Sequence, residues 1–239
     1  WRGMGVGSMG DFGSFSFQSS KLMTSGEGGA ITIKDETHLQ KAMSLINCGR
    51  KEPGYDGFDG LMFGWNYRLG DIHVAILQAQ MDRLDEVTMS RQKMAAEFRD
   101  LLHSSVNGLR VLDPDPRQTR LHAYQTVMKY DPAQFGGVHR DRFLEALEAE
   151  GVGFHGDFYT ALHEHELMDA KSDQYPMLRE RYGDGIHSVK GNFPVSVKAG
   201  YHEAVWMHYS YLSGTRKDLQ DVVEAILKVQ SNVGELAGR

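Results

Sequence analysis

The alternation of apolar and polar positions predicts two strands near the start of the chain. Residues 12–17 alternate aromatic side chains with small or polar ones, a period of two that suits a strand. A polar turn containing Lys21 and a glycine-rich run over residues 24–29 follow, and a β-branched run occupies residues 30–33. We therefore expect two strands joined by a polar, glycine-rich connection that carries Lys21.

Apolar residues at helical spacing predict four helices further along the chain. Each begins at a residue that can cap a helix or ends at a glycine or a polar break. The longest pattern has an apolar stripe that starts at Ile72, with charged residues around it. The four ranges are 35–47, opened by Asp35; 71–102; 140–150, ended by Gly151; and a last helix from Thr215, with Asp218 three residues on and a stripe of Leu219, Val222, Val223, Ile226 and Val229.

The remaining segments look extended or irregular. Residues 123–130, 193–197 and 205–212 have strand-like patterns, and residues 49–70 predict a long ordered loop, since they hold many glycines and aromatics with little periodicity. The run Asp-Pro-Asp-Pro at residues 113–116 predicts a stiff linker between domains. We expect an α/β protein, with one domain over residues 1–112 and a smaller α/β domain over residues 113–239.

Composition narrows the classes of function. Hydrophobic residues make up 41% of the 239 residues and charged residues 24%, so the chain can form a globular core. The net charge of −6 argues against a general nucleic-acid binder, and the apolar runs are too short to span a membrane. The single cysteine, Cys48, excludes an intrachain disulfide, so we expect a reducing compartment, the cytoplasm.

Two short motifs suggest chemistry that their context does not support. Residues 5–10 match G-x-G-x-x-G, but a dinucleotide site needs a strand before the motif and a helix after it, and a strand pattern follows here. His163 and His165, in the run His-Glu-His-Glu over 163–166, would point to different sides of a helix, which favours a solvated face. We predict no metal site.

Lys21 is the strongest candidate for chemistry. Most lysines are solvated surface residues, yet this one follows an aromatic strand and precedes a glycine-rich turn. A lysine held at a fixed point and partly desolvated suits attack on a carbonyl to form a Schiff base. Hydroxyl groups that could bind a phosphate surround it: Ser16, Ser19, Ser20, Thr24 and Ser25.

Two long motifs carry a family resemblance over nearly the whole chain. The first is residues 7–29, with Ser-Phe-Ser-Phe-Gln-Ser-Ser-Lys at 14–21 and Gly-Glu-Gly-Gly-Ala at 26–30. The second is Gly-Trp-Asn-Tyr-Arg-Leu at 64–69, followed by a helix rich in alanine and glutamine. Together they resemble the DegT/StrS family of aminotransferases, which depend on pyridoxal phosphate (PLP) and act on keto sugars and cyclitols.

The resemblance implies a fold and roles for individual residues. The fold would be that of the aspartate-aminotransferase-like PLP enzymes (fold type I), with residues 1–112 as the C-terminal part of the large cofactor domain and 113–239 as the small domain. Lys21 matches the Schiff-base lysine, and Ser16 matches a serine that binds the cofactor phosphate. Asn66 matches an asparagine that reaches the phosphate in the neighbouring subunit, which implies a homodimer. Arg68 matches the family arginine, whose fork suits the carboxylate of an amino donor.

The resemblance also implies the reaction. A donor, L-glutamine or L-glutamate, would pass its amino group to a keto sugar or keto cyclitol, with Tyr124, His122 and Tyr159 lining the acceptor pocket or serving as aromatic core. Many members have histidine and proline at the positions of Gln18 and Ser19. The version found here is closer to glutamine:scyllo-inosose aminotransferases and aminohydroxybenzoate synthase, in pathways of antibiotic or polysaccharide biosynthesis.

Two alternatives remain open on these grounds. One is a dehydratase and aromatase of the aminohydroxybenzoate synthase type, and the other is a non-catalytic partner subunit, which would have no need of Lys21. The family's carboxylate partner of the pyridine nitrogen belongs just upstream of Trp1. We therefore expect the 239-residue chain to be a fragment with little activity by itself.

Overall fold

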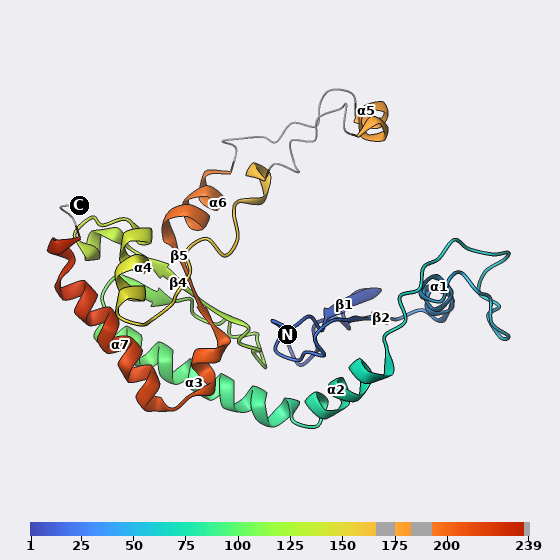
Figure 1. Cartoon of the computed structure of the whole chain (residues 1–239), viewed down its shortest axis with the longest axis horizontal. Helices are drawn as coiled ribbons and strands as arrows, with labels where there is room; N and C mark the ends of the chain where they lie inside the picture. The colour runs from blue at the N-terminus through green and yellow to red at the C-terminus, as the bar shows by residue number, and fades with distance from the viewer. Residues whose placement is uncertain (166–174, 183–192, 237–239) are drawn as a thin grey trace. The chain divides into compact units, whose positions relative to one another are not determined.

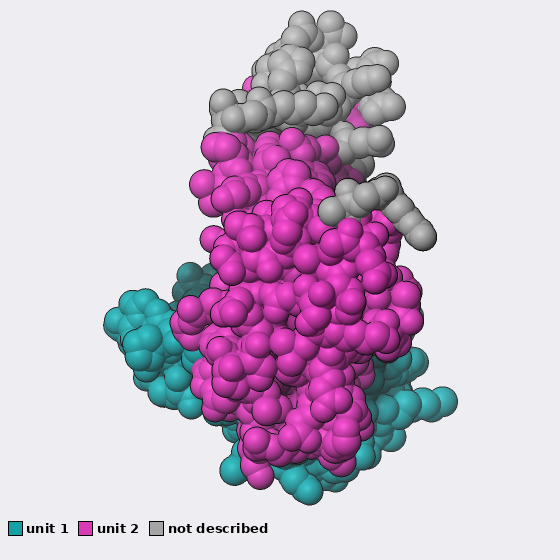
Figure 2. All heavy atoms as spheres, turned by 90° about the vertical axis from the view of Figure 1, so that its left-hand side faces the viewer, with its two compact units in different colours: residues 1–92, 114–124 teal, residues 93–113, 125–239 magenta. Residues whose placement is uncertain are grey.

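The computed structural model describes residues 1–165, 175–182 and 193–236, in two compact units (Figures 1 and 2). Unit 1 comprises residues 1–92 and 114–124, and unit 2 comprises residues 93–113 and 125–239. The chain thus returns to unit 1 for eleven residues, which begin at Pro114, the first proline of the predicted linker. A single domain boundary at 112/113 stays a prediction about the whole protein.

Unit 1 is built on a two-stranded antiparallel hairpin and two helices. Strands β1 (Phe12–Ser16) and β2 (Gly29–Ile33) pair with Phe12 opposite Ile33 and Ser16 opposite Gly29. Helix α1 (Glu36–Ile46) begins as predicted at Asp35, whose carboxylate accepts a hydrogen bond from the His38 N–H at 3.1 Å. This hydrogen bond lowers the pKa of Asp35. Helix α2 (Asp71–Met81) follows the long loop.

Unit 2 holds a three-stranded antiparallel sheet and the best-packed helices. The strands are β3 (Leu109–Val111), β4 (Gln125–Tyr130) and β5 (Ala204–His208), in the order β3-β4-β5. Helix α3 (Leu84–Ser105) begins in unit 1 and continues into unit 2, which also contains α4 (Arg140–Ala149) and α7 (Arg216–Ser231) (Figure 1). The shorter helices are η1 (Pro132–Phe135), η2 (Leu162–Glu164), α5 (Pro176–Tyr182), α6 (Pro194–Lys198), η4 (Ala199–Glu203), η5 (Tyr209–Ser213) and η6 (Val233–Glu235).

The core of unit 2 contains an aromatic cluster at the end of β4. Tyr130, Phe135 and Phe143 are fully buried, with ring centroids 4.7–5.2 Å apart. The Tyr130 hydroxyl donates to the Val138 carbonyl at 2.9 Å, so burial leaves no unsatisfied hydroxyl there. Burial, with a smaller effect of the Asp131 carboxylate, raises the pKa of Tyr130. The predicted apolar stripe of α7 is buried throughout.

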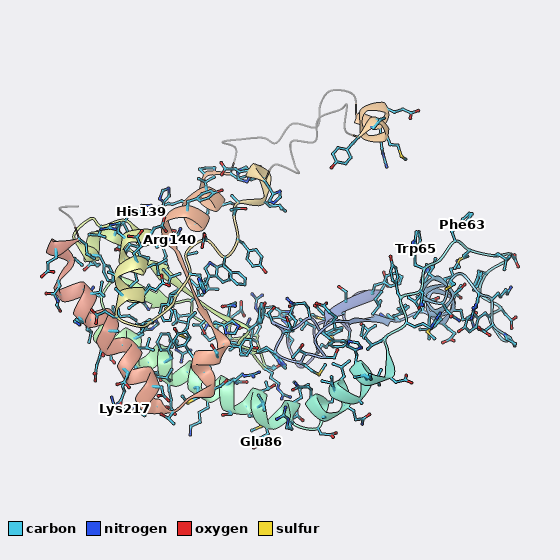
Figure 3. All side chains as sticks on the ribbon, in the orientation of Figure 1. Phe63, Trp65, Glu86, His139, Arg140 and Lys217 are labelled. Carbon is cyan, nitrogen blue, oxygen red and sulfur yellow. The ribbon has the colours of Figure 1, made fainter. Side chains whose placement is uncertain are left out.

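A buried charge anchors the region around η4 in unit 2. The Arg140 side chain is 2% exposed and donates to the carbonyls of Gly200 and Ala204 at 2.7 and 3.1 Å. Figure 3 shows Arg140 beside His139 at the start of α4. Because the guanidinium occupies the space next to Gly156, a Cβ at that glycine would collide with it. Arg140 therefore ties α4 to η4 and the start of β5.

Three sequence predictions about elements need correction. The pattern over 71–102 forms two helices, α2 and α3, because the chain turns at residues 82–83. Residues 193–197 are not extended: Pro194 sets the φ of a first helical turn, and α6 forms despite the alternating valines. Of the predicted strand at 205–212, only the first part lies in β5, and the rest forms η5. The short strand β3 was not predicted.

Unit 1 exposes much of the apolar surface that its pattern marks as core. In α1, Leu39 and Met43 are 37% and 43% exposed, and in α2, Ile72 and Ile76 are 77% and 42% exposed. Amphipathic faces of this kind are normally buried against another element or chain.

Among the described residues, no helix combines the length and the apolar character that crossing a membrane requires.

Candidate active site

Backbone hydrogen bonds close the turn that carries Lys21. The Phe17 N–H donates to the Gly28 carbonyl at 2.9 Å, and the Ser25 N–H donates to the Phe17 carbonyl at 3.0 Å. The Lys21 N–H donates to the Gln18 carbonyl at 2.9 Å. The connection between β1 and β2 is therefore an ordered loop that contains Lys21, as the sequence predicted.

Tyr124 contacts this turn from 103 residues further along the chain, in the part of unit 1 that returns after the prolines. The Lys21 Nζ atom lies 4.8 Å from the centroid of the Tyr124 ring. The Tyr124 hydroxyl oxygen lies 3.4 Å from Ser20 Oγ. Of the seven residues that we predicted for the site, Lys21 and Tyr124 are brought into direct contact.

Hydroxyl and amide groups gather around Gln18, next to Lys21. Ser16 Oγ, at the end of β1, accepts from the Gln18 N–H at 3.4 Å. The Gln18 side-chain oxygen accepts from both the N–H and the hydroxyl of Ser20, at 2.9 and 2.7 Å, and its Nε2 donates to Ser19 Oγ at 2.8 Å. These serines are exposed, so their hydroxyls are accessible to an anion. A lysine amine beside several hydroxyl donors fits a phosphorylated aldehyde such as PLP.

Asn66 and Arg68 lie on an extended segment that pairs with the end of α1. The Trp65 N–H donates to the Leu45 carbonyl at 2.9 Å, and the Cys48 N–H donates to the Trp65 carbonyl at 3.0 Å. Successive residues of such a segment point to opposite sides, so Asn66 and Arg68, which are two residues apart, share one side. The Arg68 guanidinium donates to a residue of α1's C-terminus, Asn47, at 2.7 Å between Nη1 and Oδ1.

A close approach joins this segment to the Lys21 turn. Gly28 has φ +131°, and a Cβ there would lie 2.7 Å from Leu69 Cδ1. Leu69 follows Arg68 directly, so a glycine at position 28 lets the two family motifs meet within unit 1.

His122 lies two residues before Tyr124 and has an altered titration. Partial burial lowers the pKa of His122, and the nearby Arg120 guanidinium lowers it further, while Asp85 opposes them. Arg120 and Asp85 form an ion pair at 2.7 Å. The His122 carbonyl accepts the Tyr124 N–H at 2.9 Å, so the two residues share one tight turn.

Tyr159 belongs to unit 2, where it lies in an aromatic cluster. Its ring centroid is 4.7 Å from that of Phe158 and 5.8 Å from that of Trp206, and Tyr159 is 61% exposed. In the same unit, His163 lies in η2, and Glu166 of the His-Glu-His-Glu run falls outside the described residues. Among residues 1–165, 175–182 and 193–236, no group of three or more His, Cys, Asp or Glu side chains is placed to hold a metal ion.

Sequence reasoning missed two residues of this arrangement. Asn47, which binds the Arg68 side chain, was read only as the end of a helix. The sequence signal is Gly49, a residue type that permits a sharp turn. In the structure, Cys48 and Gly49 both adopt positive φ, and this turn positions Asn47. Gln18 was read as a departure from the family pattern, and its hydrogen bonds to two serines could not be derived from sequence spacing.

Comparisons with known proteins agree on one family. A family model described as the DegT/DnrJ/EryC1/StrS aminotransferase family matches residues 1–227. The chain is 48% identical over 238 residues to a putative L-glutamine:3-amino-2,3-dideoxy-scyllo-inosose aminotransferase of Streptoalloteichus tenebrarius, covering 99% of this chain and 57% of that protein. A protein of Streptomyces kanamyceticus with the same name is 44% identical over 237 residues, with the same two coverages. The chain thus spans a little over half the length of these relatives.

Solved structures share the fold. The crystal structure of 3-amino-5-hydroxybenzoic acid synthase matches with a TM-score of 0.72 and 24% identity, over 97% of this chain and 57% of that one. An aminotransferase from Psychrobacter cryohalolentis matches with a TM-score of 0.72 and 21% identity, over 98% and 59%. These likenesses confirm the predicted fold class, the α/β fold of fold type I aminotransferases.

Proposed function

Because the chain belongs to the DegT/DnrJ/EryC1/StrS aminotransferase family, we propose that the whole protein is a PLP-dependent aminotransferase acting on a keto cyclitol. The observation that supports the proposal is the hydrogen-bonded turn that carries Lys21, the residue that the motif resemblance matches to the family's cofactor lysine. L-Glutamine is the proposed amino donor, since the names of the relatives at 44–48% identity pair L-glutamine with an amino-inosose.

The proposed mechanism assigns one task to each group near the turn. When bound, PLP supplies an aldehyde that takes up the amino group and a ring that withdraws electrons from the carbon being deprotonated. Lys21 would bind that aldehyde and then, as a free amine, move a proton at the substrate carbon. Ser16 and Ser19, whose Oγ atoms accept hydrogen bonds from Gln18, would donate their hydroxyl protons to the phosphate. Arg68 would bind the donor carboxylate through a two-point hydrogen bond.

We also propose a homodimer in which Asn66 reaches the cofactor phosphate of the neighbouring subunit. Exposed apolar side chains around the same segment support this proposal. Phe63 and Trp65 are 97% and 61% exposed, and their side chains extend from the loop between α1 and α2 (Figure 3). We place the enzyme in the cytoplasm, because Cys48 is the single cysteine of these 239 residues and has no partner within them for a disulfide.

The remaining proposed contacts concern the acceptor. His122 and Tyr124 lie on the turn that returns to the Lys21 loop, which supports a role next to the ketone. Tyr159 lies exposed among aromatic rings of unit 2, and a role for it at the acceptor stays a prediction from the family resemblance.

The alternative functions have weaker support. The likeness to 3-amino-5-hydroxybenzoic acid synthase is at 24% identity and concerns the fold alone, whereas both reported relatives above 40% have aminotransferase names. Product analysis separates the two chemistries, because an aromatase would generate an ultraviolet-absorbing aromatic ring without consuming glutamine. A non-catalytic subunit would have no use for the ordered Lys21.

The absorbance spectrum of the full-length protein with PLP tests the proposal. We expect a band at ~400–430 nm that is absent in Lys21→Ala and bleached by L-glutamine. Lys34→Ala, at an exposed lysine beside the same hairpin, is the matched control and should keep the band. L-Glutamate in place of glutamine identifies the donor, and mass spectrometry of a cyclitol ketone after turnover detects the amine. Absence of the band in the wild type would overturn the proposal.

A further inference from the structure

We propose that Tyr124 is a positioning residue for Lys21, with its ring face holding the amine and its hydroxyl fixed to the turn that carries Lys21. This inference rests on the proposed function, and it assigns to Tyr124 a task different from lining the acceptor pocket. Two contacts carry it, one at each end of the tyrosine side chain.

The first contact limits where the Lys21 amine can go. A lysine side chain has four rotatable bonds, so a tethered amine samples many positions unless something holds it. The face of an aromatic ring attracts an ammonium group, and here the Lys21 Nζ lies 4.8 Å from the centroid of the Tyr124 ring. The ring thus gives the amine a preferred place next to its own turn.

The second contact fixes the ring, and its direction follows from counting protons. Ser20 has one hydroxyl proton, which it donates to the Gln18 side-chain oxygen at 2.7 Å. That oxygen also accepts the Ser20 N–H at 2.9 Å, so it faces Ser20 at two points. Since the Ser20 proton is committed to Gln18, the Tyr124 hydroxyl is the donor across the 3.4 Å to Ser20 Oγ.

Together with the Gln18–Ser20 hydrogen bond, the two contacts form a continuous series of side-chain contacts from Gln18 to Lys21. Gln18 orients Ser20, Ser20 accepts from Tyr124, and the Tyr124 ring lies at Lys21, which follows Ser20 directly. Such a series matters for a lysine that must deliver a proton to one carbon, because a misplacement of about 1 Å can cost on the order of 100-fold in rate. In this role Tyr124 acts through Lys21 and does not itself bind the substrate or the cofactor.

Three variants of the full-length protein separate the two contacts. Tyr124→Leu removes ring and hydroxyl, Tyr124→Phe keeps the ring, and Ser20→Ala removes the acceptor. In the cofactor-free protein, we expect acetic anhydride to label Lys21 about 3-fold faster in Tyr124→Leu, relative to Lys34 in the same molecule, because the ring no longer covers one side of the amine. The Phe variant should label like the wild type to within about 1.5-fold.

With PLP bound, the same variants test the positioning of the proton transfer. We expect kcat to fall about 10-fold or more in Tyr124→Leu and about 3-fold in Tyr124→Phe, with KM for glutamine unchanged. The isotope effect on kcat with α-deuterated glutamine should rise in Tyr124→Leu, because proton transfer becomes slower. In the Ser20→Ala background, Tyr124→Phe should have little further effect, since both remove one hydrogen bond.

Two results would overturn the inference. One is a Tyr124→Leu protein with wild-type labelling, isotope effect and kcat. The other is a loss of kcat without a rise in the isotope effect or in Lys21 labelling, which would indicate a merely structural role. Tyr55→Leu, at a tyrosine in the loop before α2, is the control and should leave all three readouts unchanged. If the wild type forms no band with PLP, the proposed function fails, while the labelling experiment still tests the contact.

Discussion

The guanidinium of Arg68 is held by the side chain of Asn47, with 2.7 Å between Nη1 and Oδ1. Asn47 in turn donates from Nδ2 to the Glu52 carboxylate at 3.2 Å, which leaves its oxygen facing Arg68. The Cys48 sulfur lies 3.8 Å from the same Nη1 atom. Arg68 thus has one nitrogen anchored at the end of α1, an arrangement that pre-orients the rest of the fork.

This relationship predicts that Asn47 controls the affinity for the amino donor. Asn47→Ala should raise KM for L-glutamine about 5-fold with kcat nearly unchanged, because the arginine loses its anchor before substrate binds. Asn47→Asp should raise KM further, since a carboxylate would compete with the donor for the guanidinium. Steady-state kinetics at several donor concentrations measures both, with the exposed Asn107→Ala as control. An unchanged KM in both Asn47 variants would contradict a donor role for Arg68.

Ser16 provides a second prediction, about cofactor affinity. Ser16→Ala should raise the Kd for PLP at least about 10-fold, because a hydrogen bond to a charged phosphate contributes roughly 1.5–3 kcal/mol. Ser14→Ala is the matched control, as an exposed serine on the same strand β1, two residues away. Titration of the cofactor-free protein with PLP, followed by absorbance, gives both constants. Equal Kd values for the two variants would remove Ser16 from the phosphate site.

In unit 1, local sequence patterns predicted where the strands and helices lie better than they predicted which side chains are buried. Asp35 and the β1–β2 pairing follow from short-range rules, namely capping and a period of two. Apolar residues at helical spacing also predicted helix α1, yet two of its apolar residues, Leu39 and Met43, are exposed. Apolar residues at helical spacing indicate that a helix has an apolar face. What covers that face depends on residues outside the helix.

In the candidate site, too, short-range features could be predicted from the sequence, whereas long-range contacts could not. Lys21 could be proposed from sequence because its turn combines an aromatic strand with a glycine-rich run, and the family motif supports the proposal. Its contact with Tyr124 could not, since it joins residues 103 apart through a return of the chain into unit 1. The helix at 194–198 was missed for the opposite reason, because alternating valines favour a strand locally and the surrounding fold overrides them.

The exposed aromatic residues of the loop before α2 lead to a prediction about assembly. Phe63→Glu should shift the full-length protein from dimer toward monomer, because it places a charge on a side chain that is 97% exposed within this chain. Sedimentation velocity over a range of concentrations measures the shift. Glu86→Lys, an exposed charge change on α3, should leave the dimer intact. A Phe63→Glu protein that dimerises like the wild type would place the interface elsewhere.

Glu203 in η4 links two basic side chains of unit 2. Its carboxylate lies 2.9 Å from Lys198 Nζ and 3.6 Å from Lys129 Nζ, and its side chain is 18% exposed. The hydrogen bond from Lys198 lowers the pKa of Glu203 below its ordinary value of 4.5, with Lys129 adding to the effect and burial opposing it. The charged form of Glu203 is therefore favoured in the folded state over the unfolded state.

The sign of the pH dependence follows from that direction. A carboxylate with a lowered folded-state pKa stabilises the fold at pH values above 4.5, and this contribution disappears as the pH falls through the folded-state pKa. We expect Glu203→Gln to lower the free energy of unfolding by less than about 1 kcal/mol near neutral pH, because the pair is partly solvated. The difference from wild type should vanish in acid. Thermal unfolding of the full-length protein from neutral pH down to about pH 2, below the lowered folded-state pKa, checks this. The exposed Glu148→Gln serves as control, and a deficit that persists in acid would mean that Glu203 stabilises through packing instead of charge.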